Sequence, residues 1–157
     1  HAMSFTISGL PIDEFQPLFG LPDAALAARG VNRKRADKKP GYPCRITLED
    51  AEPGEDVLLL NYVSHKAQTP YRSAYAVYVR ESAEKPAVFV DELPPVFRGR
   101  PIALRIFDAG GMLIGADLSL NGAARDNIAR AFDNPNAAYI HAHNAMHGCF
   151  AAEIKRR

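Results

Sequence analysis

Hydrophobic and polar residues alternate over several short stretches of the chain, a period of two that is typical of strands with one buried face. An unbroken apolar run over residues 57–63 predicts a strand that is central in a sheet. The other strands are expected at residues 4–7, 44–49, 74–80, 87–90, 138–144 and 149–154. Strands therefore dominate the predicted structure.

A β-hairpin is the clearest predicted element. Its first strand has an apolar face formed by Ile102, Leu104 and Ile106, and Asp108-Ala109-Gly110-Gly111 then turns the chain. The return strand also has one apolar face, which consists of Met112, Ile114, Ala116, Leu118 and Leu120.

Two helices are predicted from capping and periodicity. A short one runs from Pro22 to Ala28 and ends before Gly30. A longer one has an apolar stripe of Ala124, Ile128, Ala131 and Phe132, with Asn121 as its expected N-cap. Most strands follow one another through turns too short for a crossover helix. We therefore expect an α+β fold, with a mainly antiparallel sheet and two or three short helices.

Length and composition indicate a single domain, expected over residues 3–157. A chain of 157 residues has the size of one domain, and such a domain buries roughly 68–70% of its unfolded surface. Its 47% hydrophobic and 24% charged residues are ordinary for a globular protein. No apolar run approaches the roughly 18 residues of a membrane span. His1-Ala2 before Met3 is interpreted as a cloning remnant.

Charge and cysteine content favour a cytoplasmic protein that does not bind nucleic acid or membranes. The net charge of +1 gives no strong field. A basic stretch over 29–39 could grip phosphates, but it lacks interleaved aromatic residues and is interpreted as a solvated connector. No signal peptide is recognisable at the start of the sequence. Cys44 and Cys149 are accordingly expected to be reduced thiols.

The side chains best suited to metal binding or catalysis lie close together near the C-terminus. His141 and His143 are two apart on a predicted strand, so both side chains should lie on one face, about 6.6 Å apart along the chain. They could bind a divalent transition metal such as zinc, with His147 as a further candidate ligand. Glu153 could return on the neighbouring strand and orient an imidazole.

A thiol site is a second hypothesis, in which Cys149 acts as nucleophile or redox thiol beside His143. Strand register decides between two arrangements. A four-residue loop over 145–148 places Asn144 opposite Cys149 and puts both histidines on the other face, whereas a loop one residue longer or shorter places His143 opposite the thiol.

A third hypothesis is a binding module for a small molecule or anion. Arginines on or beside strands can hold an anionic group in two hydrogen bonds, and tyrosines supply aromatic surface. The candidate ligand-binding residues are Arg45, His65, Arg72, His143 and Asn144. This hypothesis is preferred, with a metal-dependent or Cys149-based enzyme as the alternative.

Several short phrases in a fixed order carry a family resemblance. They are Pro43-Cys44-Arg45, Pro70-Tyr71-Arg72-Ser73, Val90-Asp91-Glu92-Leu93-Pro94, Phe107-Asp108-Ala109, His143-Asn144-Ala145 and Gly148-Cys149-Phe150-Ala151. In this order the chain resembles the bacterial domain-of-unknown-function family numbered 1203, from Met3 onward. The resemblance implies a small single-domain bacterial protein and brings no catalytic residues with it.

Overall fold

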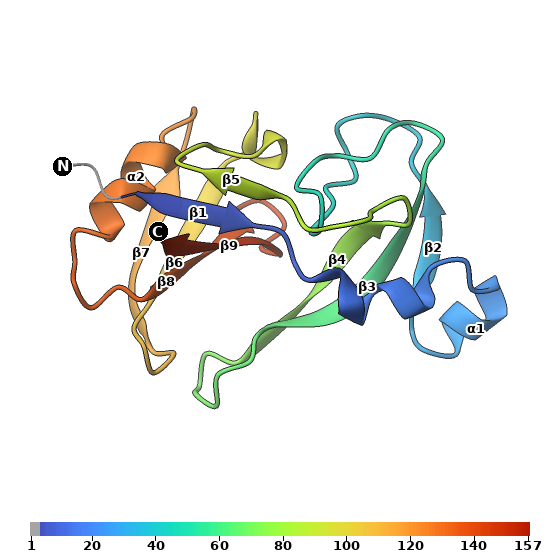
Figure 1. The fold of residues 1–157 in the computed structure, drawn as a ribbon, viewed down its shortest axis with the longest axis horizontal. Helices are drawn as coiled ribbons and strands as arrows, with labels where there is room; N and C mark the ends of the chain where they lie inside the picture. Colours follow the sequence, from blue (N-terminus) through green and yellow to red (C-terminus); the bar gives the residue numbers. More distant parts are fainter. Residues whose placement is uncertain (1–3) are drawn as a thin grey trace.

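Two antiparallel sheets make up most of the molecule in the computed structural model, which describes residues 4–157. The residues interpreted as a cloning remnant, and Met3, lie outside the described residues. Figure 1 shows the two sheets side by side along the longest axis. The six-stranded sheet has the order β5-β1-β9-β8-β6-β7, and the three-stranded sheet has the order β2-β3-β4.

The strands fall close to where alternation predicts them. Their bounds are β1 Phe5–Ser8, β2 Asn32–Arg35, β3 Asp56–His65, β4 Ser73–Arg80, β5 Val88–Val90, β6 Ile102–Phe107, β7 Leu113–Ser119, β8 Tyr139–Asn144 and β9 Phe150–Arg156. All pairings between these strands are antiparallel. Within residues 4–157 the helical elements are α1 Asp23–Ala27, α2 Ala124–Ala131 and short 3-10 helices at Ile12–Glu14, Gln16–Leu18 and Pro95–Phe97. The α+β class with a mainly antiparallel sheet is therefore confirmed.

Helix α2 covers one face of the six-stranded sheet. Its predicted stripe is correct, since Ile128 and Phe132 are buried against Leu104, Ile140 and Ile154. The predicted N-cap is wrong, because the helix begins after Ala123 and has no side-chain cap. Asn121 instead has a φ of 53° in the turn before the helix. No helix in the described part of the chain is long and apolar enough to cross a membrane.

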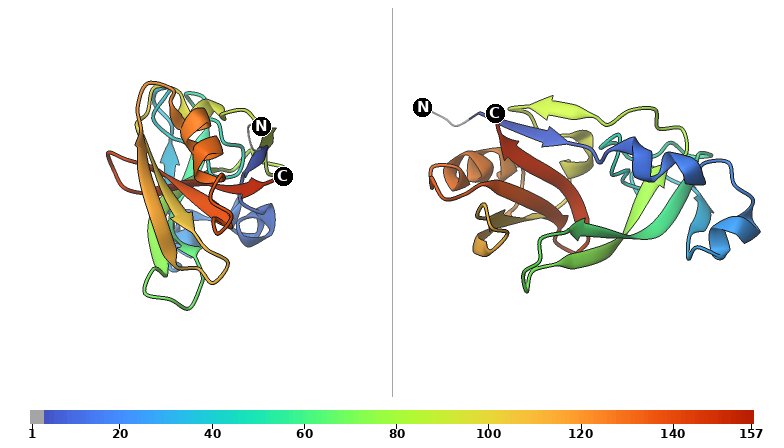
Figure 2. Two further views of the ribbon diagram at one scale, coloured as in Figure 1. Left: turned by 90° about the vertical axis from the view of Figure 1, so that its left-hand side faces the viewer. Right: turned by 60° about the horizontal axis from the view of Figure 1, so that its bottom comes forward.

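The opposite face of the six-stranded sheet is turned toward the three-stranded sheet. The right-hand view in Figure 2 shows the turn that joins β8 to β9, in red, beside the green strands of the β3–β4 hairpin. At this junction Tyr75 of β4 lies against His143 of β8, with ring centroids 5.0 Å apart. Polar side chains of the sheet are therefore buried between the two sheets rather than exposed to water.

The basic stretch over 29–39 is only partly a connector. Residues 32–35 form β2, an edge strand that pairs with β3. Arg33 joins Glu81 at 2.8 Å and also pairs with Asp23. Charged side chains on an edge strand discourage pairing with other chains, which explains why this strand is so polar.

The strand predicted at 44–49 is wrong, although its buried positions are correct. Cys44, Ile46 and Leu48 are buried, but the segment is a tight turn in which the amide of Leu48 donates to the carbonyl of Cys44 at 3.0 Å. The Cys44 sulfur accepts the amides of Ile46 and Thr47, at 3.3 and 3.4 Å. Local acceptors therefore replace the strand ladder that the alternation predicted.

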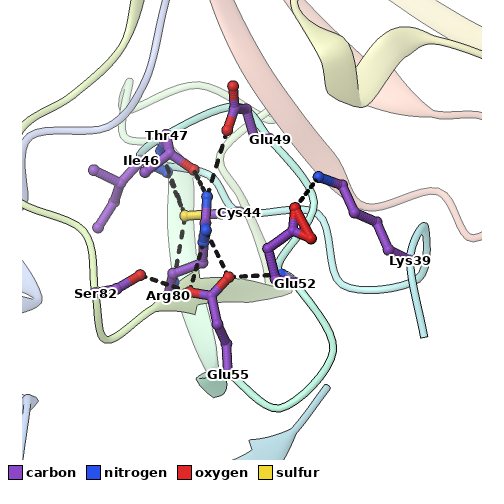
Figure 3. A network of polar contacts seen from close by, with 9 residues as sticks. All are labelled: Lys39, Cys44, Ile46, Thr47, Glu49, Glu52, Glu55, Arg80 and Ser82. Atoms are coloured by element: carbon purple, nitrogen blue, oxygen red, sulfur yellow. Dashed lines mark hydrogen bonds and ion pairs between the residues drawn. The ribbon is translucent and has the colours of Figure 1, made fainter. Parts of the chain in front are cut away.

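Figure 3 shows the polar contacts of Arg80 on β4, which reach this turn at Thr47 and Glu49 and also include Glu55. Arg80 donates to both carboxylate oxygens of Glu55, and Ser82 donates to one of them at 2.6 Å. Burial by itself would raise the pKa of Glu55, but these hydrogen bonds lower it to about 2. The carboxylate therefore stays ionised and keeps its ion pair with Arg80 over a wide pH range.

The β6–β7 hairpin is confirmed, but the apolar face of its return strand is exposed. Met112, Ile114, Leu118 and Leu120 are all between 39% and 55% exposed. Because β7 is an edge strand and α2 covers the other face of the sheet, few side chains cover these residues.

Two leucines of this hairpin, one buried and one exposed, provide a stability test. Leu104→Ala should lower the free energy of unfolding by about 2–5 kcal/mol, since it leaves a cavity beneath α2. Leu118→Ala, at a position 55% exposed, should change it by less than about 0.5 kcal/mol. Urea denaturation of both variants measures the difference, and equal losses would contradict this burial pattern.

Candidate functional site

The register of β8 and β9 determines which side chains reach the junction of the sheets. His141 pairs with Glu153, and His143 pairs with Phe150, so Ala151 is an extra residue on β9. This bulge places Phe150 and Glu153 on the same face as the two histidines. Asn144 and Cys149 pair through the Asn144 amide and the Cys149 carbonyl at 2.9 Å, as expected for the four-residue loop.

The two strand histidines are buried, each with one ring nitrogen in a defined hydrogen bond. His143 is 2% exposed, and its Nδ1 lies 2.9 Å from the carbonyl oxygen of Gly148. Since a carbonyl only accepts, Nδ1 carries the proton and the neutral ring keeps its lone pair on Nε2. His141 is 1% exposed, and its Nε2 lies 3.0 Å from Glu153. The hydrogen bond from His141 lowers the pKa of Glu153.

His65 lines a small pocket to which Phe150 also contributes. Its Nδ1 donates to the carbonyl of Tyr71 at 2.9 Å, and its Nε2 accepts the Tyr139 hydroxyl at 2.6 Å. Burial lowers the pKa of His65, which keeps the ring neutral in this role. The pocket has a volume of about 260 Å³ and is also lined by His141 and Glu153. Both nitrogens of His65 are thus already hydrogen-bonded.

The larger cavity at the junction lies between the β3–β4 hairpin and the β8–β9 turn. We call it the Arg45 pocket, and its volume is about 600 Å³. Its charged, polar and aromatic lining residues are Lys38, Arg45, Tyr75, Tyr78, Arg100, Asn144, His147 and Cys149. No Asp or Glu in the described chain lines this pocket, so its walls carry cationic groups without acidic ones.

Arg45 is the most constrained of these cations. The residue is 2% exposed, and its Nε donates to the Phe150 carbonyl at 2.8 Å. One terminal nitrogen donates to the Pro43 carbonyl at 2.6 Å, and the other lies 3.1 Å from the Cys149 sulfur. Burial lowers the pKa of Arg45, but a guanidinium stays charged in proteins.

The charge of Arg45 is not neutralised by a carboxylate. None of the ion pairs formed among residues 4–157 includes Arg45. Its three protein acceptors are neutral carbonyls and a sulfur, and a guanidinium has five N–H donors. A buried guanidinium without a carboxylate partner is stabilised when an anion binds close to it.

Two other cations in the pocket differ from Arg45 in their partners. Arg100 forms a two-pronged ion pair with the buried carboxylate of Asp50, at 2.8 and 2.9 Å. Lys38 is exposed at the rim and takes part in none of the ion pairs among residues 4–157. Its aliphatic stem lies over Gly41, where an added Cβ would stand 3.0 Å from Cε.

The structure brings some of the sequence-predicted site residues together and separates others. Arg45, Asn144, His147 and Cys149 all line the Arg45 pocket. His143 stands behind that pocket, against Tyr75, and His65 belongs to the smaller one. The guanidinium of Arg72 is directed to the carbonyl of Lys66, and this residue lines neither of these two pockets.

The pocket also contains residues that sequence reasoning missed. Arg100 and Lys38 join it from distant parts of the chain, and nothing in their local sequence distinguishes them from surface residues. Asn144 was a candidate, and its Oδ1 is buried without a hydrogen-bond partner within residues 4–157.

The three predicted metal ligands are divided between different environments. His147 lies on the exposed β8–β9 turn, whereas His141 and His143 are buried on β8. Among residues 4–157 no three His, Cys, Asp or Glu side chains are grouped so that they could hold a metal ion. A protein site for zinc usually needs at least three such ligands.

Comparison with known proteins places the chain in a family. The model of the family described as "Protein of unknown function (DUF1203)" matches residues 41–156, so the chain belongs to this family. The matched region includes Arg45, Asn144 and Cys149 and excludes Lys38. No curated protein and no solved structure matches the chain.

The burial of His143 predicts a loss of stability in mild acid. Desolvation lowers the pKa of His143 to about 4, below the value near 6.5 of an exposed histidine. Between these two values the unfolded chain binds a proton that the folded protein does not, so stability falls as the pH is lowered. The loss should approach about 3 kcal/mol for this group, since each pKa unit is worth about 1.4 kcal/mol.

His143→Gln should reduce that dependence between pH 7 and 5, as measured by urea denaturation. In the wild-type protein, the NMR signals of the His143 ring should remain those of a neutral imidazole down to about pH 5, in line with a pKa of about 4. A His143 signal that titrates near pH 6.5 would show the assignment to be wrong.

Proposed function

We propose that this protein binds a small organic anion in the Arg45 pocket. The observation that carries the proposal is the buried Arg45 guanidinium, which has no carboxylate partner within residues 4–157 and faces a cavity without acidic lining residues. A ligand with a carboxylate or phosphate group supplies the missing charge. A guanidinium matches the geometry of such groups because its N–H donors form a rigid fork.

The size and aromatic surface of the pocket favour an organic ligand over a bare inorganic ion. A volume of about 600 Å³ falls within the range of about 300–1,000 Å³ that is common for small-molecule sites. Tyr75 and Tyr78 supply aromatic surface for an apolar body.

A metal-dependent enzyme at His141 and His143 is supported less well. Each ring has one nitrogen bound to an oxygen acceptor, an arrangement that also orients metal-binding histidines. The described residues nevertheless offer no cluster of three ligands.

We also infer a cytoplasmic location, because Cys44 and Cys149 are free thiols.

Anion binding can be measured by thermal unfolding and calorimetry with inorganic phosphate and benzoate as probes. Both anions should raise the midpoint of unfolding of the wild-type protein, since binding to the folded state adds about 2.7 kcal/mol at a hundred times Kd. Benzoate should bind more tightly than phosphate, because its ring contacts the tyrosines. Added potassium chloride should weaken both.

Variants separate this pocket from general surface charge. Arg45→Met should weaken benzoate binding by about tenfold or more. Lys38→Gln should weaken it by a smaller factor, and this exposed substitution should leave the fold intact. Arg125→Gln removes an equal charge from α2, on the far side of the six-stranded sheet, and should bind as the wild-type protein does. Equal binding by all four proteins would overturn the proposal.

A further inference from the structure

Cys149 is the only thiol among residues 4–157 that lines the Arg45 pocket, and its sulfur faces hydrogen-bond donors. Arg45 donates to it at 3.1 Å, and the side-chain amide of Asn144 donates at 3.7 Å. Both groups favour negative charge on the sulfur. The residue is partly exposed, so a molecule in the pocket can reach it.

Cys44 is an internal contrast to Cys149. Its sulfur also accepts hydrogen bonds, but from the backbone amides of Ile46, Thr47 and Arg80, and it has no guanidinium donor. Cys44 is 1% exposed and lies within an apolar cluster. One thiol is thus enclosed by the core, while the other stands at the wall of a cationic cavity.

We propose that Cys149 is a nucleophile for small carboxylates that carry an electrophilic carbon, which the Arg45 pocket binds and presents to the sulfur. This inference rests on the proposed anion-binding function and adds a covalent step to it. A buried guanidinium, an asparagine amide and a thiol on one cavity wall supply the charge recognition and the attacking atom together.

The step is a nucleophilic substitution. After the thiol has given its proton to water, a sulfur electron pair attacks the electrophilic carbon, and a carbon–sulfur bond forms. The bond from that carbon to its leaving group breaks, and the leaving group departs with the electron pair. With iodoacetate as the electrophile, the products are S-carboxymethylated Cys149 and iodide, so no oxidant or reductant takes part.

The positive charge on the pocket walls favours an electrophile that is negatively charged. A cavity lined by one sign of charge raises the local concentration of opposite charges and accelerates association by about 10–1,000-fold. Of the cations on the walls of the Arg45 pocket, Lys38 and Arg45 have no carboxylate partner within residues 4–157, whereas Arg100 is paired with Asp50, and no acidic residue of the described chain lines the pocket. An anionic electrophile should therefore react faster at Cys149 than a neutral one of the same size.

Iodoacetate and iodoacetamide form a matched pair of probes of similar size, because the group beside the reactive carbon is a carboxylate in one and a neutral amide in the other. Their rates are measured separately at Cys149 and Cys44 by mass spectrometry of proteolytic peptides from the whole protein. The same measurement in urea gives the intrinsic ratio of the two rates for each cysteine. In the folded protein, the iodoacetate-to-iodoacetamide ratio at Cys149 should exceed its value in urea by about tenfold or more, and Cys44 should be almost unlabelled.

Variants and salt test the origin of the preference. Lys38→Gln should lower the iodoacetate-to-iodoacetamide ratio at Cys149, because it removes one positive charge from the exposed rim of the pocket. Arg45→Lys should lower both rates, since it removes the hydrogen bond to the sulfur but keeps a charge. Arg125→Gln serves as the charge-matched control on α2. Benzoate should slow carboxymethylation of Cys149 in proportion to its occupancy.

The outcomes separate the two proposals. If Cys149 in the folded protein reacts with both reagents no faster than it does in urea, the proposal that it is a nucleophile is wrong. This holds even where benzoate still raises the unfolding midpoint. Rapid reaction with both reagents at the intrinsic ratio would overturn the selection of anions, and with benzoate binding also absent, the anion-binding function fails as well.

Discussion

The guanidinium of Arg45 holds together segments that are far apart in sequence. Its hydrogen bonds join the loop at Pro43 to Phe150 at the start of β9 and to Cys149 in the turn before it. Water cannot replace these acceptors, because the residue is almost fully buried. The positions of the loop, the turn and the pocket between them therefore depend on one charged side chain. The protein supplies hydrogen-bond acceptors for only part of its N–H donors.

The two arginines of this pocket show how the same side chain serves different purposes. Arg100 and Asp50 satisfy each other through parallel hydrogen bonds, and a buried pair of this kind fixes the geometry of the loop that carries it. Arg45 has no carboxylate partner within residues 4–157, so part of its field extends into the cavity. His143, which lies behind the pocket against Tyr75, adds no charge there, because burial lowers its pKa to about 4.

Much of the fold could be predicted from local pattern, and the site only in part. Alternation located the strands around the hairpin and at the C-terminus because their side chains face a core on one side. It failed at 44–49, where buried positions alternate but sulfur and carbonyl groups satisfy the backbone locally. It also could not show that the face of β7 lies in solvent, since that depends on where α2 packs.

The site shows the same limit. Arg45, Asn144 and Cys149 were candidates by residue type, but their meeting with Lys38 and Arg100 depends on contacts between distant segments. Arg72 was also a candidate ligand-binding residue from the sequence, but its guanidinium is directed to a backbone carbonyl instead. Residue type suggests a chemistry, whereas only the pairing of strands decides which members of a set share a cavity.

The bulge at Ala151 has a consequence for how this protein can vary. Since side chains alternate along a strand, the single extra residue sets the phase between the β8–β9 turn and the remainder of β9. A substitution within the turn leaves that phase unchanged. The deletion of one residue between 149 and 153 exchanges the two faces on one side of the bulge, which would separate the Phe150 ring from the histidines or move Glu153 away from His141. Chain length in this short segment is therefore under tighter physical constraint than the identity of most of its side chains.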